Sequence, residues 1–140
     1  MLRCVMHTSY DTIGVNYSDL RKPDSRIEMM IGRALGSAKT VLNVGAGTGS
    51  YEPADRRVTA IEPSMEMIRQ RGASAAPVIQ GYAEDLPFDD NSFDATMATL
   101  TVHHWADQER GLKEIRRVTR GQIVILTFDR SEEHTSELQS

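Results

Sequence analysis

Residues 40–52, with the sequence TVLNVGAGTGSYE, decide the fold. Val41, Leu42 and Val44 form a short apolar run, which leads into a turn in which Gly45, Gly47 and Gly49 alternate with other residues. Glycine takes a positive φ without strain and has no Cβ to keep a ligand away from the main chain. A buried parallel strand that ends in such a turn is the usual entrance to a nucleotide site in an open α/β sheet.

The spacing of the glycines separates the ligand classes. A dinucleotide-binding turn has the pattern G-x-G-x-x-G, whereas this turn reads G-x-G-x-G and carries Ser50 where the third glycine would stand. A P-loop ends in Gly-Lys-Ser or Gly-Lys-Thr, and the turn contains no lysine. A plain strand-to-helix turn stays open as the alternative.

A second strand, expected at residues 58–61, ends at Glu62. In doubly wound sheets an acidic residue at this place bonds the ribose hydroxyls of a nucleotide, and one carboxylate has lone pairs for both hydroxyls. Glu62 lies 17 residues after Gly45, which is a suitable distance. The alternative is an ordinary surface glutamate.

Few residues separate the glycine turn from the second strand. Residues 50–57 leave room for about two helical turns at most, and Pro53 is among them, so we expect a tight or irregular connection. Within it, Glu52 either points into the pocket or caps the turn.

Apolar periodicity predicts an amphipathic helix over residues 25–35, with Asp24 or Ser25 as its cap. A second helix is expected over residues 65–71, between the cap Ser64 and Gly72, and a third over residues 108–120, after the cap Asp107. We expect the last helix to turn Leu112, Ile115 and Val118 inward. It should end at Gly121, before a strand over residues 122–128. Strands that alternate with helices of this length imply parallel strands and right-handed crossovers.

Two longer motifs follow the second strand. Residues 81–94, GYAEDLPFDDNSFD, are similar to the pattern G-D-A-E-x-L-P-F-x-D-x-S-F-D, and residues 99–107, TLTVHHWAD, are similar to S-x-x-x-L-H-H-x-x-D. Together with the glycine turn as motif I, they make residues 10–129 resemble class I S-adenosylmethionine (SAM) methyltransferases of the small-molecule type. The resemblance implies an α/β, Rossmann-like, doubly wound parallel sheet. Its five strands, numbered along the chain, would lie in the order 3-2-1-4-5.

The resemblance also implies the residues of a SAM site. The glycine turn would admit the cofactor, Glu62 would hold the ribose, and the main chain around Ala83 would approach the adenine. Tyr82 stands where the family often has an aspartate, so Glu84 or Asp85 would have to supply the acceptor for the adenine amino group, or Tyr82 would pack on the ring. The implied cofactor-binding residues are Gly45, Ala46, Gly47, Thr48, Gly49, Glu62, Pro63, Tyr82, Ala83, Glu84, Ala98, Thr99 and Tyr17.

His103 is the candidate general base, and a structural hydrogen bond is its alternative role. Because His103 and His104 are adjacent, we expect them to face different ways in a regular element. Neither belongs to a metal-ligand spacing, and no metal site is expected.

The segment at residues 10–24 resembles the N-terminal helix that lies over the SAM pocket in many small-molecule methyltransferases. Tyr10 and Tyr17 are seven residues apart and would share one face of that helix. A surface helix with core-facing tyrosines is the alternative.

Composition limits the other partners. The 140 residues carry a net charge of −4, which argues against nucleic acid as the main partner. Cys4 is the single cysteine, which fits a reducing cytoplasm. The sequence shows neither an apolar stretch long enough to span a membrane nor a signal peptide, so no membrane partner is expected.

The last eleven residues, 130–140, read RSEEHTSELQS and are similar to the conceptual translation of a short-read sequencing adapter. A disordered acidic tail is the alternative. We therefore expect a SAM-binding domain over residues 1–129 that is truncated after the fifth strand and lacks the strand hairpin that follows in the family. The fifth strand would then be an exposed apolar edge.

The function expected from the resemblance is methyl transfer from SAM to a small-molecule acceptor. A nicotinamide-dependent oxidoreductase shares the glycine turn and the acidic residue, but the glycine spacing and residues 83–88, AEDLPF, disfavour it. A non-catalytic SAM-binding module and an inactive fragment remain as further alternatives.

Overall fold

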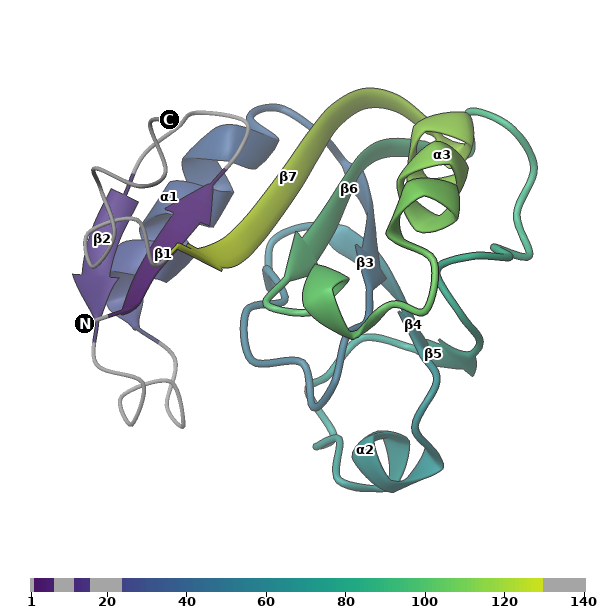
Figure 1. The fold of residues 1–140 in the computed structure, drawn as a ribbon, viewed down its shortest axis with the longest axis horizontal. Coiled ribbons are helices and arrows are strands. Elements are labelled where there is room, and N and C mark those ends of the chain that lie inside the picture. The colour runs from purple at the N-terminus through teal and green to yellow at the C-terminus, as the bar shows by residue number, and fades with distance from the viewer. Residues whose placement is uncertain (1, 7–11, 16–23, 130–140) are drawn as a thin grey trace, which may run out of the picture.

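The computed structural model describes residues 2–6, 12–15 and 24–129, which form one sheet with helices on its faces (Figure 1). The strands are β1 (Leu2–Met6), β2 (Thr12–Val15), β3 (Thr40–Val44), β4 (Arg57–Glu62), β5 (Val78–Gln80), β6 (Phe93–Thr99) and β7 (Thr119–Asp129). They lie in the order β2-β1-β7-β6-β3-β4-β5. The helices are α1 (Ser25–Leu35), α2 (Met65–Arg69), the short 3₁₀ helix η2 (Val102–His104) and α3 (Gln108–Val118).

The five strands from β3 to β7 pair in parallel. Numbered from one to five along the chain, they stand in the order 3-2-1-4-5, which confirms the predicted α/β arrangement. β3 lies in the middle of this parallel part, between β4 and β6. The glycine turn therefore leaves the sheet at its centre, where neighbours on both sides hold it.

The two N-terminal strands extend the sheet beyond β7. β1 runs antiparallel to β7, from Arg3 opposite Asp129 to Met6 opposite Leu126, and β2 pairs antiparallel with β1. The prediction of an exposed edge at the fifth strand is therefore wrong for residues 126–129, because β1 supplies the pairing partner.

The N-terminal helix predicted over residues 10–24 is wrong at Thr12–Val15, which form β2. Three of these four residues are β-branched, which favours a strand. Tyr10 and Tyr17 lie outside the described residues.

Helices α1 and α3 bury the two faces of the sheet. α1 begins after the N-cap Asp24, ends at Leu35 before the C-cap Gly36, and turns Ile27, Met30, Ile31 and Leu35 inward. Alternate residues of β3 divide between the two cores, with Val41 packed on the α1 side and Leu42 packed on the α3 side. Among the described residues, no helix is long and apolar enough to cross a membrane.

The connection after the glycine turn is irregular, as predicted. None of residues 45–56, all of which the structure describes, is helical, and the chain passes through turns until β4 begins at Arg57. α2 follows β4, with Ser64 as its N-cap, and ends at Arg69, two residues earlier than predicted. Arg71 lies beyond the helix and turns its side chain back toward the glycine turn.

The boundary between α3 and β7 differs from the prediction. The helix ends at Val118, and the Thr119 hydroxyl donates to the Ile115 carbonyl at 2.6 Å. Gly121 lies inside β7 instead of ending the helix. A glycine is needed at this position because a Cβ would collide with the Asp94 carbonyl. Leu112, expected in the core, is 39% exposed.

Asp94 ties together the starts of three strands. Its Oδ2 accepts hydrogen bonds from the amides of Lys39 and Thr40, at 2.9 and 3.1 Å, and its Oδ1 accepts one from Arg120 Nε at 2.9 Å. The two amides and then the guanidinium lower the pKa of Asp94 from 3.8 to about 2. A lowered carboxyl pKa means that the stabilisation is complete above pH 3.8 and is lost as the pH falls toward 2.

We predict that Asp94→Asn removes this part of the acid sensitivity. Urea unfolding at pH 5 and at pH 3 measures it: the wild-type free energy of unfolding should fall between these values by more than that of the variant. Asp89→Asn, at an exposed carboxyl, is the control and should follow the wild type. An Asp94→Asn variant with the wild-type pH dependence would contradict the assignment.

Candidate functional site

The candidate site lies at the carboxyl ends of β3, β4 and β6. β4 and then β5 lie on one side of β3, and the chain then crosses to the other side of β3, where β6 and β7 lie. The strand order therefore reverses at β3. In open α/β sheets, ligands bind in the crevice at such a switch point. The glycine turn follows β3, Glu62 is the last residue of β4, and residues 100–104 follow β6, so all of them lie at this edge of the parallel sheet.

All three glycines of the turn have a positive φ: 69° at Gly45, 56° at Gly47 and 91° at Gly49. Gly45 and Ala46 both donate their amides to the Ile61 carbonyl at 2.9 Å, which fastens the turn to β4. The prediction that the turn needs glycine for its backbone geometry is therefore confirmed.

The first two glycines have different neighbours. A Cβ on Gly45 would collide with the Thr101 side chain, whose Cγ2 would lie 2.7 Å away, so the end of β3 and the segment after β6 are in close contact. Beside Gly47, a Cβ would meet nothing within 4 Å. Only the second of these positions leaves space next to the main chain for a ligand.

Glu62 closes the site from the β4 side and is only 6% exposed. Its Oε1 accepts the Gly47 amide at 2.7 Å, and its Oε2 accepts the Ser64 amide at 2.9 Å. A carboxylate offers about four lone-pair positions, so about two remain for a ligand. The alternative of an ordinary surface glutamate does not fit a side chain this deeply buried.

Glu52 has a partner that the sequence analysis missed. Its carboxylate forms a buried ion pair with Arg71 at 2.8 Å, with the two side chains 6% and 4% exposed. Arg71 also donates to the Gly47 carbonyl at 3.0 Å, and Asn43 Nδ2 donates to Glu52 Oε2 at 2.9 Å. Glu52 therefore braces the turn from inside. No local pattern in the sequence marks this pair, because its members lie 19 residues apart with β4 and α2 between them.

The residues expected around an adenine lie next to Glu62 in the fold, because the Gly81 amide donates to the Glu62 carbonyl at 3.2 Å. Tyr82 is 61% exposed and Ala83 is 5% exposed. Glu84 is already engaged, since its Oε2 accepts the Asp107 amide at 2.9 Å. Of the acceptors considered for an adenine amino group, Glu84 is thus tied to the start of α3.

Helix α3 fixes this segment from behind. Arg110 Nε donates to the Glu84 carbonyl at 3.0 Å, and Glu114 Oε1 accepts the Leu86 amide at 2.9 Å. Arg117 bonds Glu114 at 2.7 Å, and this hydrogen bond is the main reason why the pKa of Glu114 lies below its usual value. The position of Ala83 is therefore set by side chains of α3.

The remaining predicted residues surround the same edge. Ala98 is buried and Thr99 is half-buried at the end of β6. Ala46 is buried in the turn, whereas Thr48 is exposed and Pro63 is half-buried. Leu100 follows β6 with a φ of 58°, a conformation that costs a residue with a Cβ about 1–2 kcal/mol. This strained position lies where β6 gives way to the segment that contacts Gly45.

His103 and His104 lie in η2, after Thr101. Their rings lie 3.9 Å apart with an interplanar angle of 43°, so the prediction that the two face different ways is wrong. The expectation assumed a regular element, whereas η2 is a single 3₁₀ turn of three residues. Desolvation, followed by the nearby His104, lowers the pKa of His103, which keeps this ring neutral at pH 7.

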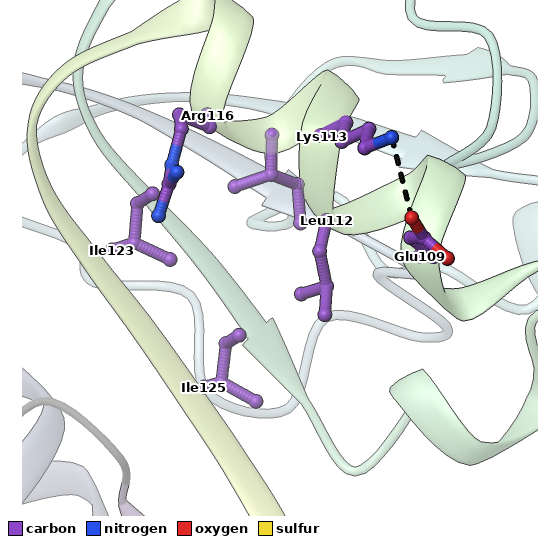
Figure 2. A pocket seen from close by; sticks show the side chains of 7 residues that line it. Glu109, Leu112, Lys113, Arg116, Ile123 and Ile125 are labelled. Carbon is purple, nitrogen blue, oxygen red and sulfur yellow. Dashed lines mark ion pairs between the residues drawn. The ribbon is translucent and has the colours of Figure 1, made fainter.

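A groove of about 430 Å³ lies elsewhere, between α3 and β7 (Figure 2). Leu112 of the helix faces Ile123 and Ile125 of the strand, and the Glu109–Lys113 ion pair lies at its border. None of its lining residues belongs to the glycine turn. Among the described residues, no group of three or more His, Cys, Asp or Glu side chains could hold a metal ion.

The hydrogen bonds of the turn decide which cofactor it fits. A dinucleotide pyrophosphate needs free amides at a helix N-terminus, but the Gly45, Ala46, Gly47 and Gly49 amides all donate to protein oxygens, and no helix follows within residues 45–56. A cofactor with a ribose diol and no phosphate fits better. Its hydroxyls can use the remaining lone pairs of Glu62, and the space beside Gly47 admits it.

Comparisons with known proteins agree with this fit. A family model described as "Methyltransferase domain" matches residues 42–126. A solved methyltransferase candidate of an antibiotic biosynthesis pathway in Anabaena variabilis is 36% identical, with a TM-score of 0.72 over 78% of this chain and 47% of that chain. A SAM-dependent methyltransferase from Thermotoga maritima is 27% identical, with a TM-score of 0.70 over 86% of this chain and 61% of that chain.

Among curated proteins, the ubiquinone/menaquinone biosynthesis C-methyltransferase UbiE of a Geobacter species is 33% identical over 111 residues, covering 67% of this chain and 47% of its own length. The chain spans less than half the length of the curated relatives it matches. The matched family and the solved structures imply SAM as the cofactor.

We predict that Gly45→Ala and Gly47→Ala differ in stability. Both place a Cβ at a positive φ, which costs about 1–2 kcal/mol, but only Gly45→Ala also drives the Cβ into Thr101, at a further ~1–3 kcal/mol. Urea unfolding of both variants measures the difference. Equal free energies of unfolding would mean that Thr101 does not press against the turn.

A second prediction concerns the histidine pair. The pKa of His103 should lie below the ordinary 6.5 because its ring is desolvated and His104 is close. His104→Gln should raise that pKa part of the way back, since only the desolvation remains. Titration of the imidazole carbons by NMR measures both values, and a His103 pKa at or above 6.5 in the wild type would refute the arrangement.

Proposed function

Because the chain belongs to the methyltransferase domain family, we propose that it binds SAM at the glycine turn. We further propose that the protein transfers the SAM methyl group to a small-molecule acceptor. The observation that carries the proposal is the hydrogen bond between Gly47 and the buried carboxylate of Glu62. This hydrogen bond places a carboxylate next to Gly47. Unlike Gly45, Gly47 has space beside its main chain, since a Cβ there would meet no atom within 4 Å.

The hydrogen bonds of the turn support SAM over a nicotinamide cofactor. Glu62 does not separate the two cofactors, because both carry a ribose diol, but only the dinucleotide also needs free turn amides for its pyrophosphate. The turn amides at residues 45–47 are taken by protein acceptors. These contacts disfavour the oxidoreductase alternative.

In this proposal each part of the site has its own role. Glu62 holds the ribose diol, the main chain of Ala83 bonds the adenine, and Tyr82 packs on the ring instead of bonding it. Ala98 and Thr99 line the methionine side. Tyr17 and His103 are assigned to the cofactor and the acceptor respectively, on the resemblance alone.

The cofactor supplies an electrophilic methyl group on its sulfonium. The chain's own contribution is orientation, which accounts for a large share of the rate enhancement in reactions of this kind. His103 is the candidate base for an acceptor that must lose a proton, and its lowered pKa keeps the imidazole unprotonated and able to accept at pH 7.

A small-molecule acceptor is supported by the names of the relatives. The Geobacter relative is named for a step of quinone biosynthesis and the Anabaena structure for an antibiotic pathway. The net charge of −4 also makes nucleic acid an unfavourable partner. We propose a cytoplasmic location on the basis of the single cysteine.

Glu62→Gln tests the site. The amide group cannot accept both main-chain amides and a diol, so the affinity for SAM should fall by roughly 10- to 100-fold, which corresponds to the loss of one or two hydrogen bonds to a charged group. Isothermal titration calorimetry with SAM measures it.

Glu66→Gln is the matched control, because Glu66 is a 71% exposed carboxylate on the neighbouring α2 and should bind SAM like the wild type. Wild-type affinity in Glu62→Gln, or binding of NADH in competition with SAM, would contradict the proposal.

A further inference from the structure

The glycine turn lacks the support that usually holds such turns. In doubly wound sheets a helix follows the turn directly, and its first peptide groups fix the turn's orientation. Here the turn is followed by an irregular connection up to β4. Some other contact has to hold the main chain of Gly47 in place.

We infer that the buried Glu52–Arg71 ion pair replaces that helix and that Arg71 is a positioning residue for the cofactor site. Its role rests on the proposed SAM binding at the turn. Arg71 acts on the cofactor through Gly47 and Glu62, not by touching the cofactor itself.

Arg71 joins three separate segments with one guanidinium. Its Nη2 bonds both carboxylate oxygens of Glu52 at 2.8 Å and also the Ala76 carbonyl at 2.8 Å. Its Nη1 donates to the Gly47 carbonyl at 3.0 Å. A guanidinium presents its N–H groups from separate nitrogens in a fixed plane and can reach acceptors on different segments, whereas an ammonium group donates from one atom.

Glu52 in turn is held on every side. Besides Arg71, its oxygens accept the Ala76 amide at 2.9 Å and Asn43 Nδ2 at 2.9 Å. The Glu52 amide donates to the Gly49 carbonyl at 3.2 Å. The pair therefore links the end of β3, the turn and the segment before β5.

The two main-chain polar groups of Gly47 are fixed from different sides. The amide is held by Glu62 at 2.7 Å and the carbonyl by Arg71 at 3.0 Å. φ at this glycine is 56°, and a Cβ there would meet no atom within 4 Å, so packing on that side does not hold its conformation. Rotation of the Gly47 peptides would move the amide off Glu62 and free that carboxylate to turn away from a diol.

Energetics favour a positioning role over a purely stabilising one. A buried ion pair costs desolvation of two charges, and replacing it by uncharged groups of similar volume is often neutral for stability. What uncharged groups cannot replace is the directional bond to the Gly47 carbonyl. Stability and cofactor affinity should therefore respond differently to removal of the pair.

The test compares Arg71→Met, Glu52→Gln and the double variant with the wild type. Each single variant leaves one buried charge without its partner and should lose stability toward urea. The double variant should recover most of that stability. It should still bind SAM about tenfold more weakly than the wild type, because the Gly47 carbonyl remains unheld. Arg69→Met, at a 68% exposed arginine of α2, is the matched control and should match the wild type in both measurements.

A second readout needs no ligand. Amide hydrogen exchange of Gly47 should be faster in the double variant than in the wild type, while exchange in the core of β3 stays unchanged. Wild-type affinity together with wild-type Gly47 exchange in the double variant would reduce the pair to a structural role and overturn the inference.

Arg71→Lys covers the case in which Arg71→Met does not fold. Lysine keeps the positive charge next to Glu52 but cannot reach Gly47 and Ala76 together, so it should fold, exchange the Gly47 amide faster and bind SAM more weakly. An Arg71→Lys variant identical to the wild type in both readouts would overturn the inference. If the wild type itself binds no SAM, the proposed function fails, and the exchange rates still decide whether Arg71 holds the turn.

Discussion

The geometry of the candidate site depends on how the main chain of Gly47 is held, beyond the carboxyl end of the central strand β3. Its amide bonds a buried carboxylate and its carbonyl bonds a buried guanidinium. Both contacts come from later parts of the chain, one from the end of β4 and one from the segment after α2. A glycine turn is flexible by itself, and here side-chain chemistry supplies the order that a following helix supplies in related folds. The site is therefore a product of the tertiary structure and not of the turn alone.

Much of the fold was predictable from the sequence, because it follows from local patterns. Val41, Leu42 and Val44 are apolar because a central parallel strand is covered on both faces, and the three glycines stand where positive φ values are needed. The position of Glu62 beside the turn was predictable because this residue ends a strand at a suitable distance from the glycines. The strand order followed from the family resemblance, and the sheet confirms it.

The rest depended on contacts between distant residues. The Glu52–Arg71 pair joins positions 19 residues apart, with β4 and α2 between them, so no local pattern marks it. Gly121 stands in the sequence where a glycine that ends a helix would stand. In the structure a glycine is needed there because the Asp94 carbonyl of the neighbouring strand leaves no room for a Cβ. The pairing of β1 with β7 joins the two ends of the described chain. Spacing rules for a regular element also failed at the histidines, because η2 is a single 3₁₀ turn.

The most direct test of the account follows the backbone amides of the ¹⁵N-labelled chain by NMR while SAM is added. We expect the largest changes in amide chemical shift at the glycine turn, at residues 62–64 and around Ala83. The amides that line the groove between α3 and β7 should change little. These three segments converge on one edge of the sheet, so they should respond together and with one affinity. Shifts concentrated in the groove, or no shifts at millimolar SAM, would contradict the claim that the braced glycine turn is the cofactor site.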